Sequence, residues 1–180
     1  AAASVIAEQG LANLRISDVA DRAGMTVGHV TYYFPSKNEL LVRAIRHSEL
    51  EFQANVHAQL ARRHDPWARL RALIAAASAT GPKDPGWMLW FEVWANAVSD
   101  PALAAIQQEL AGWWQATLAE VVADGIADGV FHTDDPTRAV AVISGLTDGL
   151  SVRLALSDGD FTRKRMLSLI IGTAEELVGR

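Results

Sequence analysis

Residues 16–41 have the sequence ISDVADRAGMTVGHVTYYFPSKNELL, which predicts two short helices joined by a tight turn and followed by a longer helix. Two helices that cross closely need a small residue inside the first helix and a glycine at the turn, and Ala20 and Gly24 stand at those positions. Apolar residues are expected at the seam between them, where we place Val19, Ala23, Met25, Val30 and Tyr33. The pattern predicts a helix-turn-helix, in which the second helix enters the major groove of DNA.

The second helix of this pair is predicted over residues 27–34. Thr26 can cap it, which would leave backbone amides and a positive helix end where a phosphate can approach. Once Val30 and Phe34 point inward, the outward face holds Val27, Gly28, His29, Thr31 and part of Tyr32. The alternative is an ordinary helical corner, in which the tyrosines only pack and Lys37 is merely solvated.

The same stretch resembles the DNA-binding region of TetR-family transcriptional regulators almost throughout, and its most specific part is the tail YYFPSK at residues 32–37. The resemblance implies contacts with bases or phosphates along the second helix and a phosphate contact by Lys37. The expected DNA-binding residues are Thr26, Val27, Gly28, His29, Thr31, Tyr32, Tyr33 and Lys37. Family members often carry a polar or basic residue where Val27 stands and an aromatic one where Thr31 stands, so no operator sequence is inferred.

The rest of the chain carries strong signals for helix starts. Asp-Pro pairs occur at residues 65–66, 84–85, 100–101 and 135–136, and Asp suits the cap while Pro suits the first helical position. Ser36 and Glu39 form a capping-box pattern that predicts a long helix from about Lys37 into the low sixties. Between these marks the apolar residues recur with a helical period, and no strand pattern is found. We therefore predict an all-α chain of about nine helices, with a DNA-binding domain at residues 1–47 and an effector-binding and dimerisation domain at residues 48–180.

Composition limits the alternatives. The 180 residues are half apolar, include no cysteine and carry a net charge of −5. Residues 1–47 hold five basic and four acidic side chains, a net charge of +1. The remainder holds eleven basic and seventeen acidic side chains, a net charge of −6. The acidity therefore lies outside the predicted DNA-binding part. With no long apolar run and no leader pattern, we expect a cytoplasmic protein with no membrane association. The chain opens with three alanines rather than Met, so we expect the true start of the first helix to precede it.

Tryptophans are concentrated in one part of the chain. Five of the six lie between residues 87 and 114, and two predicted helices that bear them can wall an apolar cavity, the usual character of a small-molecule site. The expected lining is Trp87, Trp90, Phe91, Trp94, Trp113 and Trp114, with Glu92, Asn96 and Gln115 as orienting polar groups. The alternative is that these rings simply fill the core.

Several C-terminal stretches are similar to BetI-like members of the TetR family. They are WMLWFEVWA at residues 87–95, DPAL at residues 100–103, GVF at residues 129–131 and DGL at residues 148–150. The similarity implies a helical body that binds an effector and forms a dimer, and we expect a largely apolar small molecule whose binding changes the spacing of two DNA-reading heads.

Homodimerisation is expected because one recognition helix contacts few base pairs, so two copies are usually placed on half-sites of a palindrome. The last two helices suit a self-complementary face, with small residues on one and an apolar stripe on the other. The expected interface residues are Ala141, Ser144, Gly145, Asp148, Gly149, Leu167, Ile170, Ile171, Ala174 and Leu177. The alternative is that both helices pack only within one subunit.

Motifs for catalysis, nucleotide binding and metal binding are not found, so we expect no enzyme activity, no cofactor and no metal. His57 and His64 are seven residues apart on one predicted helix, too far for the i, i+4 pair that commonly binds zinc. The expected partners are operator double-stranded DNA, a small-molecule effector and a second copy of the chain. Repression is favoured over activation because it needs only occupancy of a promoter. The runner-up is a helical small-molecule binding module without DNA binding, and an all-helical enzyme comes third.

Overall fold

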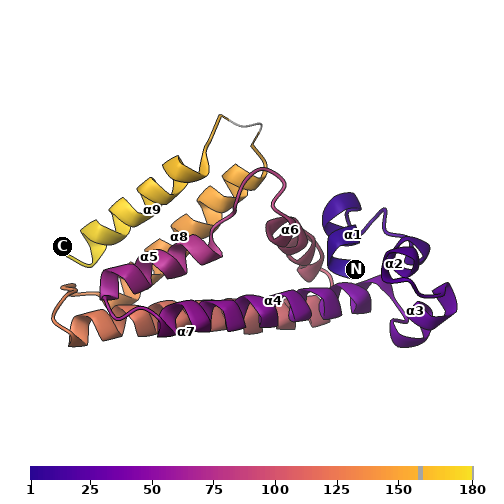
Figure 1. The fold of residues 1–180 in the computed structure, drawn as a ribbon, viewed down its shortest axis with the longest axis horizontal. Helices are drawn as coiled ribbons and strands as arrows, with labels where there is room; N and C mark the ends of the chain where they lie inside the picture. Colours follow the sequence, from indigo (N-terminus) through magenta and orange to yellow (C-terminus); the bar gives the residue numbers. More distant parts are fainter. Residues whose placement is uncertain (158–159, 180) are drawn as a thin grey trace. The chain divides into compact units, whose positions relative to one another are not determined.

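The computed structural model describes residues 1–157 and 160–179, and all regular structure in those residues is helical. The helices, shown in Figure 1, are α1 (Ala2–Gln9), α2 (Ile16–Ala23), α3 (Val27–Tyr33), α4 (Lys37–Ala61), α5 (Pro66–Ala77), α6 (Pro85–Ala97), α7 (Pro101–Ala127), α8 (Pro136–Ala155) and α9 (Arg163–Leu177). The prediction of an all-α chain with about nine helices is confirmed. In the described part of the chain, no helix has the length and apolar character that crossing a membrane requires.

The Asp-Pro pairs begin helices, as predicted. Asp65, Asp84 and Asp135 each accept a hydrogen bond from the amide three residues ahead, at 2.6, 3.1 and 2.8 Å, and the following proline occupies the first turn. The capping box before α4 forms only in half. Ser36 Oγ accepts from the Glu39 amide at 3.1 Å, but the Glu39 carboxylate accepts from Arg43 Nε at 3.2 Å instead of binding back to the cap.

The chain divides into two compact units. One comprises residues 1–52 and 83–110, and the other comprises residues 53–82 and 111–180. Helices α4 and α7 each contribute to both units, and α6 belongs to the first, where it packs against α1. The division of roles at residue 47 stays a prediction, because compactness alone assigns no function.

The first unit has a continuous apolar core built from α1–α4, α6 and the start of α7. An Arg22 fork joins α2 to α1, with its two terminal nitrogens 2.9 and 2.8 Å from the Glu8 carboxylate oxygens. This contact lowers the pKa of Glu8, since the guanidinium favours the ionised carboxylate. Gly24 adopts the left-handed conformation, with φ 66°, which ends α2 and allows the sharp turn into α3.

The predicted seam of the helix-turn-helix is partly wrong. Val19, Ala20 and Val30 are buried, as expected, but Ala23, Met25 and Tyr33 are exposed. For Tyr33, the reason is that α3 has only seven residues and Val30 is the one that it buries.

The second unit is built around the packing of α9 on α5 and α8. Its core includes Phe131, whose ring meets Trp67 edge-on at a centroid distance of 4.7 Å and lies directly on the backbone of α7 at Gly125. Backbone groups at the C-terminal end of α5 form hydrogen bonds with side chains of α8 and α9. Arg163 donates to the carbonyls of Ala75 and Ala79 at 2.8 and 3.3 Å, while Ser151 Oγ accepts from the Ala79 amide at 3.1 Å.

Candidate nucleic-acid interface and effector site

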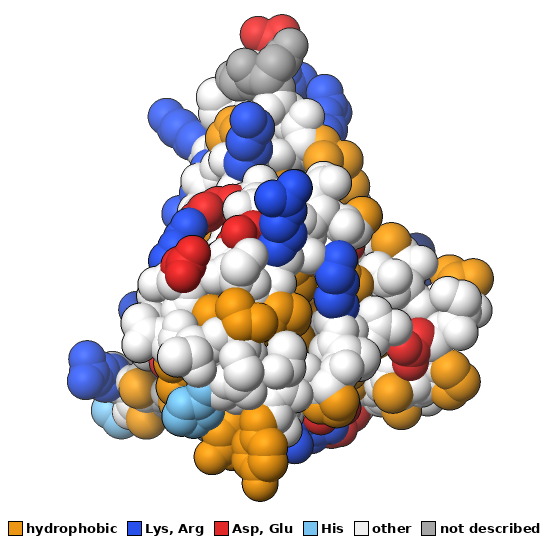
Figure 2. All heavy atoms as spheres, turned by 90° about the vertical axis from the view of Figure 1, so that its right-hand side faces the viewer, with side chains coloured by type: hydrophobic (Ala, Val, Ile, Leu, Met, Phe, Trp, Pro, Cys, Tyr) orange, Lys and Arg blue, Asp and Glu red, His pale blue; other side chains and the backbone are white. Residues whose placement is uncertain are grey.

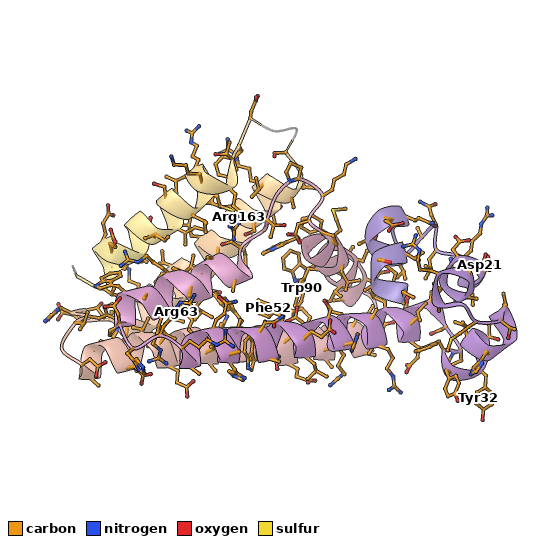
Figure 3. The ribbon with its side chains drawn as sticks, in the orientation of Figure 1. Asp21, Tyr32, Phe52, Arg63, Trp90 and Arg163 are labelled. Carbon is orange, nitrogen blue, oxygen red and sulfur yellow. The ribbon has the colours of Figure 1, made fainter. Side chains whose placement is uncertain are left out.

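Helix α3 has the construction expected of a DNA-reading helix. Thr26 Oγ1 accepts a hydrogen bond from the His29 amide at 3.2 Å and so caps the helix, as predicted from the sequence. Val30 is 3% exposed and anchors the helix, whereas Val27 and Tyr32 are 47% and 80% exposed. Figure 3 shows Tyr32 pointing away from the rest of the helix pair, and Figure 2 shows hydrophobic side chains on the surface at the level of α3. The predicted DNA-contacting residues of α3 are therefore all at the surface.

The exposed side chains of α3 are ordered by contacts with one another. The His29 and Tyr33 rings stack at 5.4 Å, and the Tyr32 and Tyr33 rings meet edge-on at 5.1 Å. The Thr31 hydroxyl donates to the carbonyls of Val27 and Gly28, at 3.0 and 3.2 Å. A Cβ added to Gly28 would meet no atom within 4 Å, so the glycine leaves room for a close approach from outside. This face is arranged before any DNA binds.

Lys37 stands at the head of α4, where it was predicted to hold a phosphate. Its Nζ donates to the Ala12 carbonyl at 3.4 Å, and the side chain remains exposed. Lys37 also lines a cleft of about 270 Å³, together with Leu11, Ala12, Asn38, Glu92 and Asn96. The ammonium group is thus held near the start of a 25-residue helix, where the helix dipole also favours an anion.

The two kinds of DNA contact predict different mutant behaviour. Lys37→Ala should weaken binding to every duplex and reduce the slope of log affinity against log salt by about 0.9, the value for one phosphate. His29→Ala should chiefly change the preference among sequences, because His29 lies on the α3 face that is predicted to contact base edges. Titrating both variants with operator and random DNA at several salt concentrations measures the difference, and equal effects from the two substitutions would contradict the assignment.

Four aromatic side chains lie on one side of α6, as the sequence predicted. Trp94 is central, with ring centroids 5.8 Å from Trp87, 5.8 Å from Trp90 and 6.0 Å from Phe91. All four rings are partly exposed. Glu92 and Asn96 were expected beside these rings, but they lie on another side of α6, where they line the cleft with Lys37. The correction follows from the helical period, since residues two apart point about 200° away from each other.

Sequence reasoning missed Glu49, on α4. The residue is 9% exposed, and its Oε1 accepts a hydrogen bond from Trp90 Nε1 at 2.8 Å. Burial raises the pKa of Glu49, and the Trp90 hydrogen bond opposes this in part. A signal was present in the sequence. Leu41, Ile45, Phe52 and Val56 recur at helical spacing, and Glu49 occupies the place in that stripe where an apolar residue is expected.

Trp113 and Trp114 belong to the second unit, whereas the α6 aromatics belong to the first. Trp113 meets His57 edge-on at 5.8 Å, and Trp114 Nε1 donates to Ser144 Oγ on α8 at 2.9 Å. Gln115, the third expected orienting group, is exposed on α7. A cavity shared by all six aromatic residues stays a prediction.

The residues predicted for the dimer interface fall into two groups. On α8, Ala141, Gly145, Asp148 and Gly149 are exposed, and desolvation of the Asp148 carboxyl raises its pKa although the residue as a whole is exposed. On α9, Ile170 and Ala174 are buried inside the chain, while Leu167, Ile171 and Leu177 are half-buried. Ser144 is also buried. Ile170, Ala174 and Ser144 therefore belong to the core of the second unit rather than to a surface that a partner can reach.

Both parts of the chain match known families. The model for bacterial regulatory proteins of the tetR family matches residues 1–44, and the model for the BetI-type transcriptional repressor C-terminal region matches residues 66–179. Relatives named HTH-type transcriptional regulator BetI, from Burkholderia lata and Burkholderia thailandensis, are 30% and 32% identical, each over 91% of this chain and 83% of their own length.

Solved structures agree with these matches. A transcriptional regulator from Saccharomonospora viridis, crystallised in complex with choline, has a TM-score of 0.91 and 26% identity over 99% of this chain and 94% of its own. A TetR-family regulator from Rhodococcus sp. has the same fold, with a TM-score of 0.81 at 23% identity over 99% of this chain and 94% of its own.

Proposed function

Because the chain belongs to the TetR family of DNA-binding transcriptional regulators and has a BetI-type C-terminal region, we propose that it is a homodimeric repressor that a small effector releases from its operator. The observation that carries this proposal is α3, which is capped, anchored by Val30 and ordered on its outer face. The runner-up, a binding module without DNA contacts, gives no reason for a surface of His29, Tyr32 and Tyr33 beside a glycine turn. Repression requires only that the bound dimer occupy a promoter.

The homodimer is supported by glycines that the single chain does not need. Glycine inside a helix costs about 0.5–1 kcal/mol relative to alanine, yet a Cβ at Gly145, Gly149 or Gly172 would meet nothing within 4 Å. The space is useful if a second copy packs closely there. The exposed Val142 on α8 and Leu169 on α9, at 37% and 47%, add apolar area to the same two helices. We propose that α8 and α9 of two chains form a four-helix interface.

For the effector, we propose a small cation that carries N-methyl groups, such as choline, in place of the largely apolar molecule expected from the sequence. The similar regulator from Saccharomonospora viridis was crystallised with choline. The partly exposed aromatic side chains of Trp87, Trp94 and their neighbours on α6 supply the chemistry, because aromatic faces attract quaternary ammonium groups. Because α6 packs directly on α1, a ligand that shifts α6 would also act on the DNA-binding helices.

Choline should therefore weaken operator binding. The operator is first selected from random duplexes, and its affinity is then measured with and without saturating choline, where we expect a loss of about 5–150-fold, the usual range of coupling between two sites. Ethanolamine, which has the charge but no methyl groups, is the matched control and should act much more weakly. A choline complex, detected by tryptophan fluorescence, with unchanged operator affinity would contradict the effector role.

A further inference from the structure

Glu49 is the one ionisable side chain among the buried polar residues that the structure describes. It lies on α4 at the level of Trp90, and Figure 3 shows Trp90 projecting from α6 on the side that faces α4, where Phe52 also lies. In the described residues, no lysine, arginine or histidine nitrogen lies within 4 Å of its carboxylate. The two arginines that precede Glu49 on α4 pair with other acids: Arg43 with Glu39 and Arg46 with Glu109. Among the described residues, Glu49 is thus a buried acid without a cation partner.

Such a group is costly for the free protein. A carboxylate that leaves water loses hydration, and one hydrogen bond from an indole N–H compensates only a part of that loss. The neutral isostere glutamine would also accept the Trp90 hydrogen bond without this cost. A structural role as an acceptor for Trp90 therefore does not explain an acid at this position.

The surroundings of Glu49 are those that a cation prefers. Trp90 binds Glu49 through its indole edge, and its ring centroid is 5.8 Å from that of Trp94, which contacts the rest of the aromatic group. A negative charge beside half-buried aromatic faces provides both a counter-ion and cation–π attraction. These are the two interactions that distinguish a cation from a neutral molecule of the same shape.

We propose that Glu49 is the counter-ion of the effector: a methylated ammonium group binds at the aromatic faces beside Trp90, and its charge pairs with the Glu49 carboxylate. This inference rests on the proposed function and adds to it a residue that selects charge. Glu49 thereby makes the site specific for cations, while the ring faces of α6 recognise the methyl groups.

The test compares choline with 3,3-dimethyl-1-butanol, its neutral carbon isostere, by isothermal titration calorimetry on the full chain. Wild-type protein should bind choline more tightly than the isostere. Glu49→Gln should weaken choline binding by about tenfold or more, the value of one charged contact, and change binding of the isostere less than about twofold. Glu51→Gln is the matched control, because Glu51 is exposed on the same helix and its ion pair in the described part of the chain is with His47, at 3.7 Å.

Thermal unfolding without ligand tests whether Glu49 has a structural role. Loss of a structural residue would lower the Tm, whereas removal of a buried charge without a cation partner should raise it. Because the folded-state pKa of Glu49 is raised, the folded chain favours the protonated form, so its stability falls as pH rises from the unfolded-state pKa through the folded-state pKa. Glu49→Gln removes this loss. The variant should therefore have a higher Tm than wild type at pH 7.5, and the difference should shrink as pH falls below the ordinary pKa of glutamate.

The outcomes distinguish failure of the Glu49 assignment from failure of the proposed effector class. If wild-type protein binds choline and Glu49→Gln binds it equally well, the counter-ion assignment is overturned and the effector class stands. If the variant loses choline and the isostere to the same degree, or has a lower Tm at pH 7.5, Glu49 is structural and the assignment also fails. If wild-type protein binds neither choline nor another quaternary ammonium compound, the proposed effector class fails, and the assignment fails with it.

Discussion

Gly145→Arg is expected to convert the protein to a monomer and to lower its operator affinity by at least about a hundredfold, since two linked half-site contacts typically exceed one by factors of 10²–10⁴. The substitution places a long charged side chain on the exposed face of α8, where a Cβ meets nothing within 4 Å in the single chain. The isolated subunit should tolerate it. Arginine is also a better helix former than glycine, by about 0.5–1 kcal/mol, so the helix itself is not weakened.

Light scattering and operator titration on the same samples measure both effects. Ala119→Arg is the matched control, because Ala119 is exposed on α7 of the same unit, and it should leave the mass and the affinity unchanged. A Gly145→Arg variant that remains dimeric at micromolar concentration would show that α8 does not form the interface. A variant that becomes monomeric but keeps full operator affinity would contradict the expectation that tight binding requires two half-sites.

Phe131→Ala should lower the free energy of unfolding by about 3–5 kcal/mol, the usual cost of removing a buried aromatic ring. The ring is 1% exposed, packs edge-on against Trp67 and rests on the α7 backbone at Gly125. A main-chain neighbour on one side and a large ring on the other cannot collapse into the space that the ring leaves.

Urea denaturation at fixed protein concentration gives the comparison, because the stability of a homodimer, as proposed here, depends on concentration. Leu156→Ala is the control. Leu156 is 65% exposed at the end of α8, and its truncation should cost no more than about 0.5 kcal/mol. A loss below about 1 kcal/mol for Phe131→Ala would contradict the described packing.

The helices were predictable because their signals are local. The Asp65 and Asp135 side chains bind amides only three residues ahead, so a few neighbouring residues determine where α5 and α8 begin. The exposed face of α3 was predictable for the same reason, since the cap at Thr26 and the inward Val30 lie within one short segment.

The features that escaped prediction depend on contacts between distant residues. Glu49 lies in the apolar stripe of α4, but its hydrogen bond with Trp90, 41 residues later, could not be inferred from the local sequence. Met25 is apolar and follows the turn glycine, which favours burial, yet it is 48% exposed. Glu92 was expected as an orienting polar group beside the aromatic residues, whereas the helix turns its carboxylate toward Gly10.

If Thr31 contacts the operator as predicted, its internal hydrogen bonds limit which base pair it can favour. Its single hydroxyl hydrogen is already given to carbonyls of its own helix, so the side chain offers DNA only oxygen lone pairs and a methyl group. Adenine and cytosine present amino hydrogens in the major groove and thymine presents a methyl, whereas guanine presents acceptors alone. Selected operators should therefore be depleted of guanine at the position under Thr31.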